Sequence, residues 1–213
     1  VIDELHELHP EGLDGLILCA GVPGSCHDLR LILSLNFFGT ISIIKGVYDL
    51  LEKKGGSCVA TVSNAISQGD LPMDLADILN NNNEDELRIL DLVSDLDEND
   101  LVTGNRLYVA SKYALARWVR RHSASYAANG VRINAVAPGN VNTSMTATMS
   151  VDEKTALNAL PIPTKYGKET LMEPDEVASV INFLISKAAR GVNGIIMFVD
   201  GGTDALLNSE KVY

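Results

Sequence analysis

Tyr108 and Lys112 have a spacing that suits proton transfer. They bracket the stretch Tyr-Val-Ala-Ser-Lys, and a helix would place the two side chains on one face, about 6 Å apart. A phenol with a pKa of about 10 is a poor base at neutral pH, but a nearby cation favours the phenolate and lowers that pKa. The pair could therefore exchange a proton with a substrate oxygen. The same spacing also occurs in helices by chance, so this interpretation needs support from the rest of the chain.

Ser63 and Asn36 are two further candidates. Ser63 follows an apolar run that predicts a buried strand, and a hydroxyl at that strand end could hydrogen-bond a substrate oxygen. Asn36 lies inside the apolar stretch Leu-Ser-Leu-Asn-Phe-Phe-Gly-Thr, where an amide is costly unless its hydrogen bonds are satisfied. An asparagine that only packs one helix against another would fit the same pattern, so both interpretations of Asn36 stay open.

The elements that must position these side chains alternate along the chain. Short apolar runs predict buried strands at residues 13–20, 57–62, 131–137 and 194–199. Helical patterns are found at residues 1–9, 29–54, 105–129 and 174–187. This alternation predicts an α/β fold with a doubly wound, Rossmann-like parallel sheet. Ligands bind beyond the carboxyl ends of such strands, where the polar and glycine residues are Gly21, Ser63, Pro138 and Asp200.

An acidic segment interrupts this alternation at residues 70–104. Between Asp70 and Asp100 the chain has eleven acids and one base, which accounts for −10 of the net charge of −11. Nucleic acid is therefore not expected as a partner, because phosphate binding needs a basic face. From residue 84 onward one helical stripe contains Ile89, Leu92, Val93 and Leu96. This pattern predicts a helical insertion with one covered face, and a disordered acidic loop is the alternative.

Other residue types argue against several classes of site. The three cysteines form no Cys-x-x-Cys pair, so we expect reduced thiols in a cytoplasmic protein. The four histidines are scattered without metal-ligand spacing, so no metal site is expected. No run of 18 or more apolar residues occurs, so no membrane-spanning helix is expected. The remaining expectation for a partner is a small-molecule substrate.

Several short motifs follow one another in a characteristic order. They are Leu18-Cys-Ala-Gly21, Asn36, Ser63, Tyr108-x-x-x-Lys112, Asn134-x-x-x-Pro138-Gly139-x-Val141-x-Thr143 and Val199-Asp200-Gly201-Gly202. In order and spacing they resemble the short-chain dehydrogenase/reductase family over essentially the whole chain, apart from the acidic segment. The resemblance implies an NAD(P)-dependent oxidoreductase that moves hydride between a nicotinamide cofactor and a carbonyl or secondary alcohol.

The resemblance also implies a role for each matching residue. It implies a catalytic tetrad of Asn36, Ser63, Tyr108 and Lys112. Tyr108 would be the acid/base and Ser63 would orient the substrate oxygen. Lys112 would bind the nicotinamide ribose and lower the Tyr108 pKa, and Asn36 would hold a water that relays protons to Lys112. The implied cofactor-binding residues are Ala20, Gly21, Tyr108, Lys112, Pro138, Gly139, Val141 and Thr143.

Residues 12–21, the long gap between Ser63 and Tyr108 and the ending at 200–206 resemble one group within that family, the bacterial 3α-hydroxysteroid dehydrogenase/carbonyl reductases. This implies NAD(H) as the favoured cofactor, with NADP(H) as the alternative, and a steroid-like or other bulky secondary alcohol. It also implies a homodimer that uses the acidic segment. Residues 143–171, rich in Thr, Ser, Met and Pro, are expected to form a mobile substrate lid.

Two departures from the family pattern matter. Leu18 and Cys19 replace asparagines that normally help to tie this strand to the cofactor, a change that the hydroxysteroid group shares. The family's opening strand and glycine-rich phosphate-binding turn have no counterpart before residue 13. Residues 1–213 therefore look like a single, partial dinucleotide-binding catalytic domain, and we expect the natural protein to extend N-terminally. The alternatives are a non-catalytic binding or scaffold protein on the truncated fold and a 3-oxoacyl thioester reductase.

Overall fold

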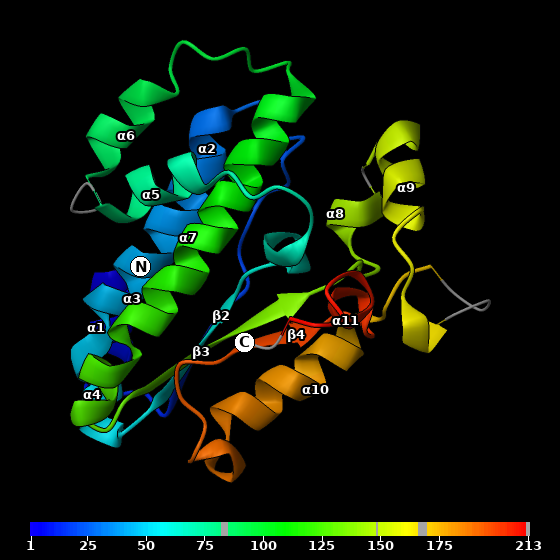
Figure 1. Cartoon of the computed structure of the whole chain (residues 1–213). Helices are drawn as coiled ribbons and strands as arrows, with labels where there is room; N and C mark the ends of the chain where they lie inside the picture. Colours follow the sequence, from blue (N-terminus) through cyan, green and yellow to red (C-terminus); the bar gives the residue numbers. More distant parts are fainter. Residues whose placement is uncertain (82–84, 148, 166–169, 212–213) are drawn as a thin grey trace.

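A four-stranded parallel sheet forms the centre of the computed structural model, which describes residues 1–81, 85–147, 149–165 and 170–211. The strands are β1 (Gly15–Leu18), β2 (Ser57–Thr61), β3 (Arg132–Pro138) and β4 (Ile196–Val199), and they lie in this order in the sheet (Figure 1). Ile17 pairs with Val59, and Val59 pairs with Asn134. Every strand lies inside its predicted segment or one residue beyond it, and helices cover both faces. The predicted doubly wound α/β fold is confirmed.

One face of the sheet is covered by α7 (Leu101–Ala128) and by the helical segment between β1 and β2 (Figure 1). That segment consists of α2 (Leu29–Leu33), the π-helical turn η1 (Ser34–Gly39), α3 (Thr40–Gly46) and α4 (Tyr48–Lys54). Phe37, Leu115 and Trp118 are fully buried where these helices meet. Each such apolar side chain contributes about 1.5–3 kcal/mol of hydrophobic stabilisation, so this layer supplies most of the core.

The opposite face is covered by α10 (Pro174–Ile185). Its start has Pro174 at the first turn and reciprocal capping between Glu173 and Glu176. Its end is held by Arg132 of β3, whose guanidinium donates to the carbonyl oxygens of Leu184 at 3.0 Å and Ser186 at 3.1 Å. One side chain of the sheet thus satisfies carbonyls that the helix end leaves without an internal partner.

The helix predicted at residues 29–54 is not continuous. Asp28 caps its start by accepting a hydrogen bond from the Leu31 amide at 2.9 Å, and the chain then widens into the π turn at Ser34–Gly39. Val47, with φ −116° and ψ 16°, separates α3 from α4. The prediction of one uninterrupted helix is wrong, because apolar periodicity does not distinguish an α turn from a single π turn inserted between two α-helical pieces.

The stretch Leu29–Gly46 is long and apolar enough to cross a bilayer by length and composition. This differs from the expectation that no such segment occurs. Half of the stretch is buried inside the domain, and its residues Ile32 and Ile44 belong to the same core cluster as Trp118 of α7. Packing within the domain therefore accounts for its apolar character.

The acidic segment contains two helices, α5 (Met73–Asn81) and α6 (Glu86–Leu92). Several of its acids have structural partners. Asp77 forms an ion pair with Arg117 of α7, and Asp85 and Asp100 cap the starts of α6 and α7. Capping and pairing with neighbouring helices give these carboxylates a role in the fold.

Two residues of the predicted apolar stripe pack on their own subunit. Ile89 and Val93 are buried in the main core, whereas Leu96 is 40% exposed. Residue 84 and the side chain of Leu92 lie outside what the structure describes. A homodimer contact through the acidic segment therefore cannot use Ile89 or Val93, and the homodimer itself stays a prediction.

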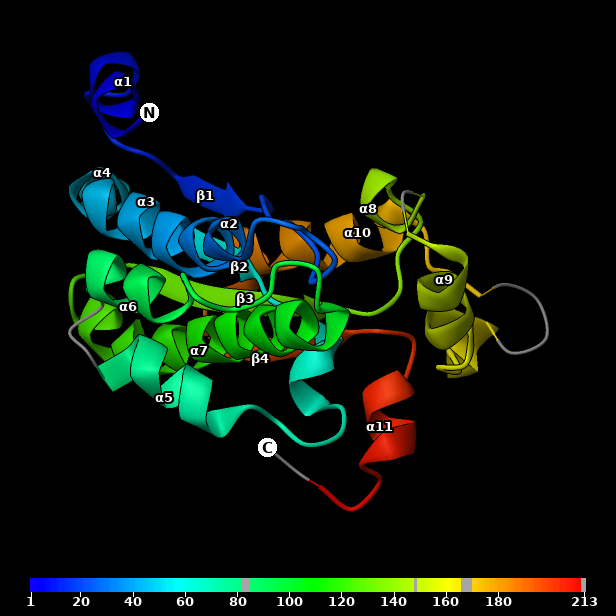
Figure 2. The same ribbon diagram turned by 90° about the horizontal axis from the view of Figure 1, so that it is seen from above.

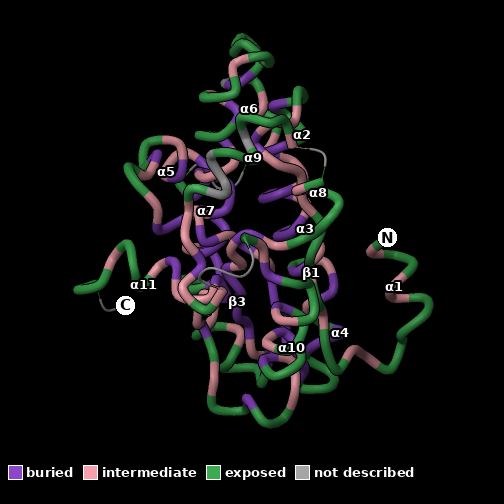
Figure 3. The backbone as a smooth tube through the Cα atoms, turned by 90° about the vertical axis from the view of Figure 1, so that its right-hand side faces the viewer, coloured by how far each residue is buried: buried purple, intermediate pink, exposed green. Residues whose placement is uncertain are grey.

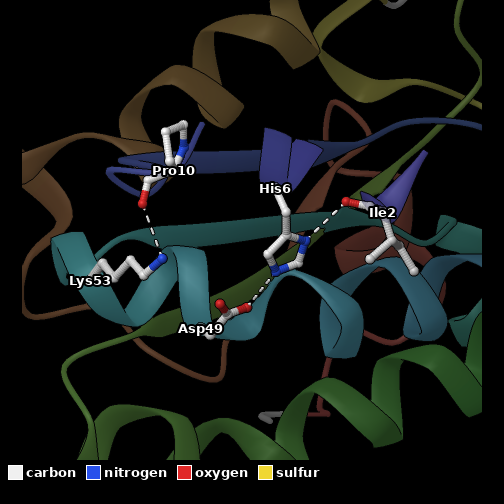
Figure 4. A network of polar contacts seen from close by, with 5 residues as sticks. All are labelled: Ile2, His6, Pro10, Asp49 and Lys53. Carbon is white, nitrogen blue, oxygen red and sulfur yellow. Dashed lines mark hydrogen bonds and ion pairs between the residues drawn. The ribbon is translucent and has the colours of Figure 1, made fainter. Parts of the chain in front are cut away.

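The N-terminal helix α1 (Ile2–Leu8) is seated on α3 and α4 by a small polar network (Figure 4). His6 Nε2 lies 2.9 Å from Asp49 Oδ1, and Lys53 Nζ donates to the Pro10 carbonyl at 3.0 Å. A Cβ on Gly46 would come within 2.5 Å of Ile2, so the glycine allows the close approach. No described residue of α1 is buried, and Figure 3 shows the helix standing out from the buried interior.

The chain between β3 and α10 extends beyond the carboxyl end of the sheet. It forms α8 (Ser144–Ala147), α9 (Val151–Asn158) and η3 (Pro163–Lys165). In Figure 2, α9 stands apart from the body of the domain. The predicted lid at residues 143–171 falls on this segment, and its residues 148 and 166–169 lie outside the described ones. Its mobility stays a prediction.

The end of the chain is fixed by one carboxylate. Asp200, which follows β4, accepts hydrogen bonds from the backbone amides of Gly202 at 3.0 Å and Asp204 at 2.7 Å. These bonds lead the chain into α11 (Thr203–Leu207). The predicted polar residue at this strand end therefore has a local role in turning the backbone.

Candidate active site

Strand ends and the middle of α7 enclose two adjoining cavities. Ser63 follows β2, where its hydroxyl accepts a hydrogen bond from the Ala65 amide at 3.2 Å and so caps the short helix η2 (Asn64–Ser67). Tyr108 comes from α7 and faces Ser63. Both side chains line both cavities. The pair therefore stands at the boundary between two compartments.

The first cavity has a volume of about 360 Å³. The predicted site residues that line it are Gly21, Ser63, Tyr108, Lys112, Pro138, Gly139, Val141 and Thr143. Its wall also contains residues that were not predicted as part of the site: Cys19, Val22, Thr61, Val62, Met145, Thr146, Pro174, Val177, Ala178 and Ile181. Most of these are apolar, and apolar residues after a strand look the same in sequence whether they line a cavity or fill a core.

The second cavity has a volume of about 190 Å³. It continues past Asn64. The residues that it shares with the first cavity are Ser63, Tyr108, Gly139, Val141, Met145 and Thr146. None of the described residues that line it is charged. Lys112 lines the first cavity and is not among the residues that line this one.

Lys112 is buried beside the first cavity. The residue is 5% exposed, and its Nζ donates to the Thr61 carbonyl at 3.0 Å. Because burial penalises the ammonium form, it lowers the pKa of Lys112 to about 8, while nearby Cys19 opposes part of the shift. An amine with this pKa can hold or release a proton close to neutral pH.

Tyr108 does not have the lowered pKa that its spacing from Lys112 predicts. Burial raises the Tyr108 pKa above its ordinary value, and the hydrogen bond from the Ser63 hydroxyl offsets only part of this effect. The Lys112 ammonium is directed at the Thr61 carbonyl, so desolvation of the phenol dominates. The predicted lowering is therefore wrong for this structure, and Tyr108 is a protonated phenol at neutral pH.

Asn36 lies behind the cavity wall in the π-helical turn. It is fully buried, its Oδ1 accepts a hydrogen bond from the Val22 amide at 2.9 Å, and its Nδ2 donates to the Val22 carbonyl at 2.9 Å. These two bonds fix the loop after β1 against the helix. Both interpretations of Asn36 are thus compatible with its position, because the amide is satisfied by the backbone and still adjoins the site.

Two glycines shape the floor of the cavities. A Cβ on Gly21 would lie 2.9 Å from Asn36 Oδ1 and 3.4 Å from Lys112 Nζ. A Cβ on Gly139 would lie 2.9 Å from the Asp200 Cβ and 3.4 Å from Asn64 Nδ2. A side chain at either position would fill the cradle that the backbone leaves. This cradle, the apolar wall and the Lys112 donor fit the nicotinamide and ribose of a dinucleotide.

One predicted cofactor residue is not in this wall. Ala20 is exposed and does not line the first cavity, whereas its neighbours Cys19 and Gly21 do. Side chains alternate along an extended chain, which explains why a motif of four consecutive residues does not place them all at the cavity. Among the described residues, no group of three or more His, Cys, Asp or Glu side chains could hold a metal ion.

Comparison with known proteins decides the family. The 3-alpha-hydroxysteroid dehydrogenase/carbonyl reductase of Comamonas testosteroni is 34% identical over 200 residues, which are 92% of this chain and 75% of that protein. A family model described as Enoyl-(Acyl carrier protein) reductase matches residues 81–204. The chain belongs to the short-chain dehydrogenase/reductase family. As a member, it is an NAD(P)-dependent oxidoreductase that transfers hydride between a nicotinamide cofactor and a carbonyl or secondary alcohol.

Other members of the family extend this result. The structure of 3-alpha-hydroxysteroid dehydrogenase from Pseudomonas sp. B-0831 complexed with NADH has a TM-score of 0.84 and 30% identity, covering 99% of this chain and 80% of that one. The 3-oxoacyl-[acyl-carrier-protein] reductase FabG of Thermotoga maritima is 36% identical over 100 residues, which are 46% of this chain and 38% of that protein. The resemblance to the hydroxysteroid group is thus confirmed over more of the chain than the resemblance to the thioester reductase.

Proposed function

We propose that this short-chain dehydrogenase/reductase interconverts a secondary alcohol and its ketone with Tyr108 as the acid/base. The observation that carries the proposal is the convergence of Ser63, Tyr108 and Lys112 on one cavity, with Asn36 directly behind Gly21. The second cavity holds the substrate on the other side of the Ser63–Tyr108 pair. The two compartments thus bring cofactor and substrate together at the residues that can move a proton.

The proton steps follow from the state of these side chains. In ketone reduction the Tyr108 phenol donates its proton to the carbonyl oxygen, and the Ser63 hydroxyl hydrogen-bonds the same oxygen. In alcohol oxidation the proton returns from the substrate hydroxyl to Tyr108. The first cavity, with Pro138, Val141 and Thr143 in its wall, would hold a nicotinamide, which would supply or accept the hydride. Lys112, whose pKa is about 8, would bind the ribose and supply protons toward Tyr108, and a water held beside Asn36 would relay protons to Lys112.

NAD(H) is the favoured cofactor in this proposal, and NADP(H) is the alternative. The Pseudomonas relative is a complex with NADH, and the 3-alpha-hydroxysteroid dehydrogenase/carbonyl reductase of Comamonas testosteroni is similar over nearly all of this chain. The wall that would hold the nicotinamide end contains Pro138, Val141 and Thr143. These residues contact the reacting half and leave the choice between the two cofactors to other contacts.

The substrate of the relatives does not transfer automatically. Hydroxysteroids are named for two relatives that are 34% and 30% identical to this chain. The residues that hold the reacting oxygen serve many substrates on one fold, whereas the walls of the second cavity select among them. The residues that line the second cavity therefore determine the substrate class.

The test of the proposal is oxidation and reduction of simple secondary alcohols and ketones by the whole protein with NAD(H) or NADP(H). Ser63→Ala should lower kcat/KM by about 10²-fold, because it removes a hydrogen bond to the oxygen on which charge develops. Ser125→Ala is the matched control, since Ser125 is exposed at the far end of α7. Equal activity in wild type and Ser63→Ala would contradict the assigned role, and failure to bind either cofactor would reject the function.

A further inference from the structure

The second cavity contains a buried amide that the proton steps leave unused. Asn64 is 5% exposed and lines this cavity directly after Ser63 in the chain. Its backbone carbonyl accepts a hydrogen bond from Ser67, but its side chain has no hydrogen-bond partner in the described part of the chain. The buried side-chain atoms without a partner among the described residues are Asn80 Oδ1 and Trp118 Nε1. The Asn64 amide is not one of them and lines the cavity, where it offers two donors and one acceptor oxygen to a molecule inside. The geometry therefore favours a polar ligand group at Asn64.

Three more amides line the same cavity, and one of them, Asn140, already has a partner. Gln68 lies one turn after Asn64, and Asn105 lies three residues before Tyr108 on α7. Neither side chain makes a hydrogen bond to the described residues. The amides of Asn64, Gln68 and Asn105 thus line the compartment next to the reacting oxygen without bonds to the described residues.

The rest of the wall is uncharged and partly apolar. It includes Met145, Met149 and Leu160, which offer surface to a carbon skeleton. No Lys, Arg or His is among the described residues that line the cavity. A carboxylate or phosphate in this compartment would lose its hydration without gaining a cation, which is unfavourable. The wall thus favours neutral molecules.

We infer that Asn64 is a specificity-determining residue that binds a second oxygen of an uncharged substrate, a hydroxyl or carbonyl close to the reacting carbon. The inference rests on the proposed function, because it takes Ser63 and Tyr108 as the groups that hold the reacting oxygen. Ser63 and Asn64 line the same cavity of about 190 Å³, so an oxygen bound by Asn64 belongs to the same small molecule as the reacting oxygen. The substrate class is therefore a neutral diol or hydroxyketone with an apolar remainder.

The test uses three cyclic alcohols with the whole protein and NAD⁺. The probes are cis-1,2-cyclohexanediol, which has a neighbouring hydroxyl, cyclohexanol, which lacks it, and cis-4-hydroxycyclohexanecarboxylate, which is charged. NADH formation gives kcat/KM for each probe in wild type, Asn64→Ala and Asn64→Ser. We expect wild type to prefer the diol over cyclohexanol by about 10- to 100-fold. The preference should vanish in Asn64→Ala and be partly retained in Asn64→Ser, whose hydroxyl can still hydrogen-bond.

Asn99→Ala is the matched control. Asn99 is exposed in the loop before α7 and contacts the Asp97 carboxylate, so its removal should leave the preference unchanged. Calorimetric titration of the NADH complex with the diol and with cyclohexanol measures the same preference without turnover, and thermal unfolding checks that each variant is folded.

The outcomes separate the two proposals. An unchanged diol preference in folded Asn64→Ala, in turnover and in binding, would overturn the role of Asn64, and so would a preference for the carboxylate. If none of the alcohols is oxidised but diol binding still depends on Asn64, the proposed function fails and the role of Asn64 in binding stands.

Discussion

Two polar networks hold elements of this protein together, and they differ chiefly in burial. At the active site, Asn36 and Lys112 bond to backbone groups of Val22 and Thr61 and are 0% and 5% exposed. At the N-terminal helix, His6 pairs with Asp49, and these side chains are 37% and 54% exposed. Each network ties a loop or helix to the same helical layer.

The difference in burial gives similar bonds very different weight. When one partner of a buried pair is removed, the other is left without water and costs about 1–3 kcal/mol. When an exposed partner is removed, water replaces it, and salt already weakens the pair. The buried network therefore determines the geometry of the chemistry, while the exposed network only seats α1.

The largest effect is expected at the acid/base itself. Tyr108→Phe should lower kcat by about 10²–10⁴-fold, because it removes the oxygen that transfers the proton and nothing else. Steady-state kinetics of the whole protein measure this, and circular dichroism checks the fold. Tyr113→Phe is the control one turn further along α7. Near-normal turnover by Tyr108→Phe would show that Tyr108 is not the acid/base and that the buried network does not position the group that transfers the proton.

Asn36→Ala should have the next largest effect. The substitution leaves both the amide and the carbonyl of Val22 without their partner. We therefore expect the free energy of unfolding, measured in denaturant, to fall by about 2–4 kcal/mol. Asn129→Ala is the control at the surface, because it removes one exposed hydrogen bond to Tyr48. Its free energy of unfolding should fall by no more than about 1 kcal/mol. Equal losses for the two variants would contradict the distinction between buried and exposed networks.

Lys112 should make stability depend on pH in a defined window. Its pKa in the folded protein is about 8, below the ordinary 10.5. Between these values the unfolded chain binds a proton that the folded protein releases, so raising the pH favours folding. The stability of wild type relative to Lys112→Met should therefore increase by about 2 kcal/mol between about pH 7.5 and 9.5. The contributions of all other titrating groups cancel when the two proteins are compared. A difference in unfolding free energy that does not change with pH would show that the pKa of Lys112 is not lowered by burial.

The smallest effect is expected at His6. Its pKa is raised by the Ile2 carbonyl and by Asp49, whose own pKa is lowered mainly by His6. The stabilisation from this ion pair is therefore fully present below the ordinary His pKa of 6.5 and is lost as the pH rises through the raised pKa of His6. At the acid end, the stabilisation is lost as Asp49 becomes protonated below 3.8.

Hydrogen exchange of the α1 amides tests this. After correction for intrinsic rates, the α1 amides of His6→Ala should exchange faster than those of wild type at pH 6 and at the same rate at pH 9. The Tm of the variant should equal that of wild type. His9→Ala is the control, since His9 is exposed just after the helix. A large drop in Tm for His6→Ala would mean that the exposed network stabilises the whole domain and does not only hold α1 in place.

The sequence predicted what depends on local pattern. Strand positions followed from apolar runs, and α7 was found although it begins at Leu101, four residues before the predicted start. The π turn was missed because it changes hydrogen bonding without changing the apolar pattern. The Tyr108 pKa was predicted in the wrong direction, since spacing along a helix reveals the neighbour but not the burial. Asn64 was overlooked because a polar residue after a strand usually serves a turn.

The wide turn at Ser34–Gly39 also sets the helical phase on either side of it. One residue more or less in an α-helix rotates everything beyond it by about 100°, and a π turn accommodates such a residue locally. Asn36 sits within this turn and reaches Val22 from there. Deletion of a single residue from the turn would leave Ser63, Tyr108 and Lys112 unchanged in type and still turn the Asn36 amide away from its loop. For this stretch, loop and helix lengths are as much a part of the active site as the side chains are.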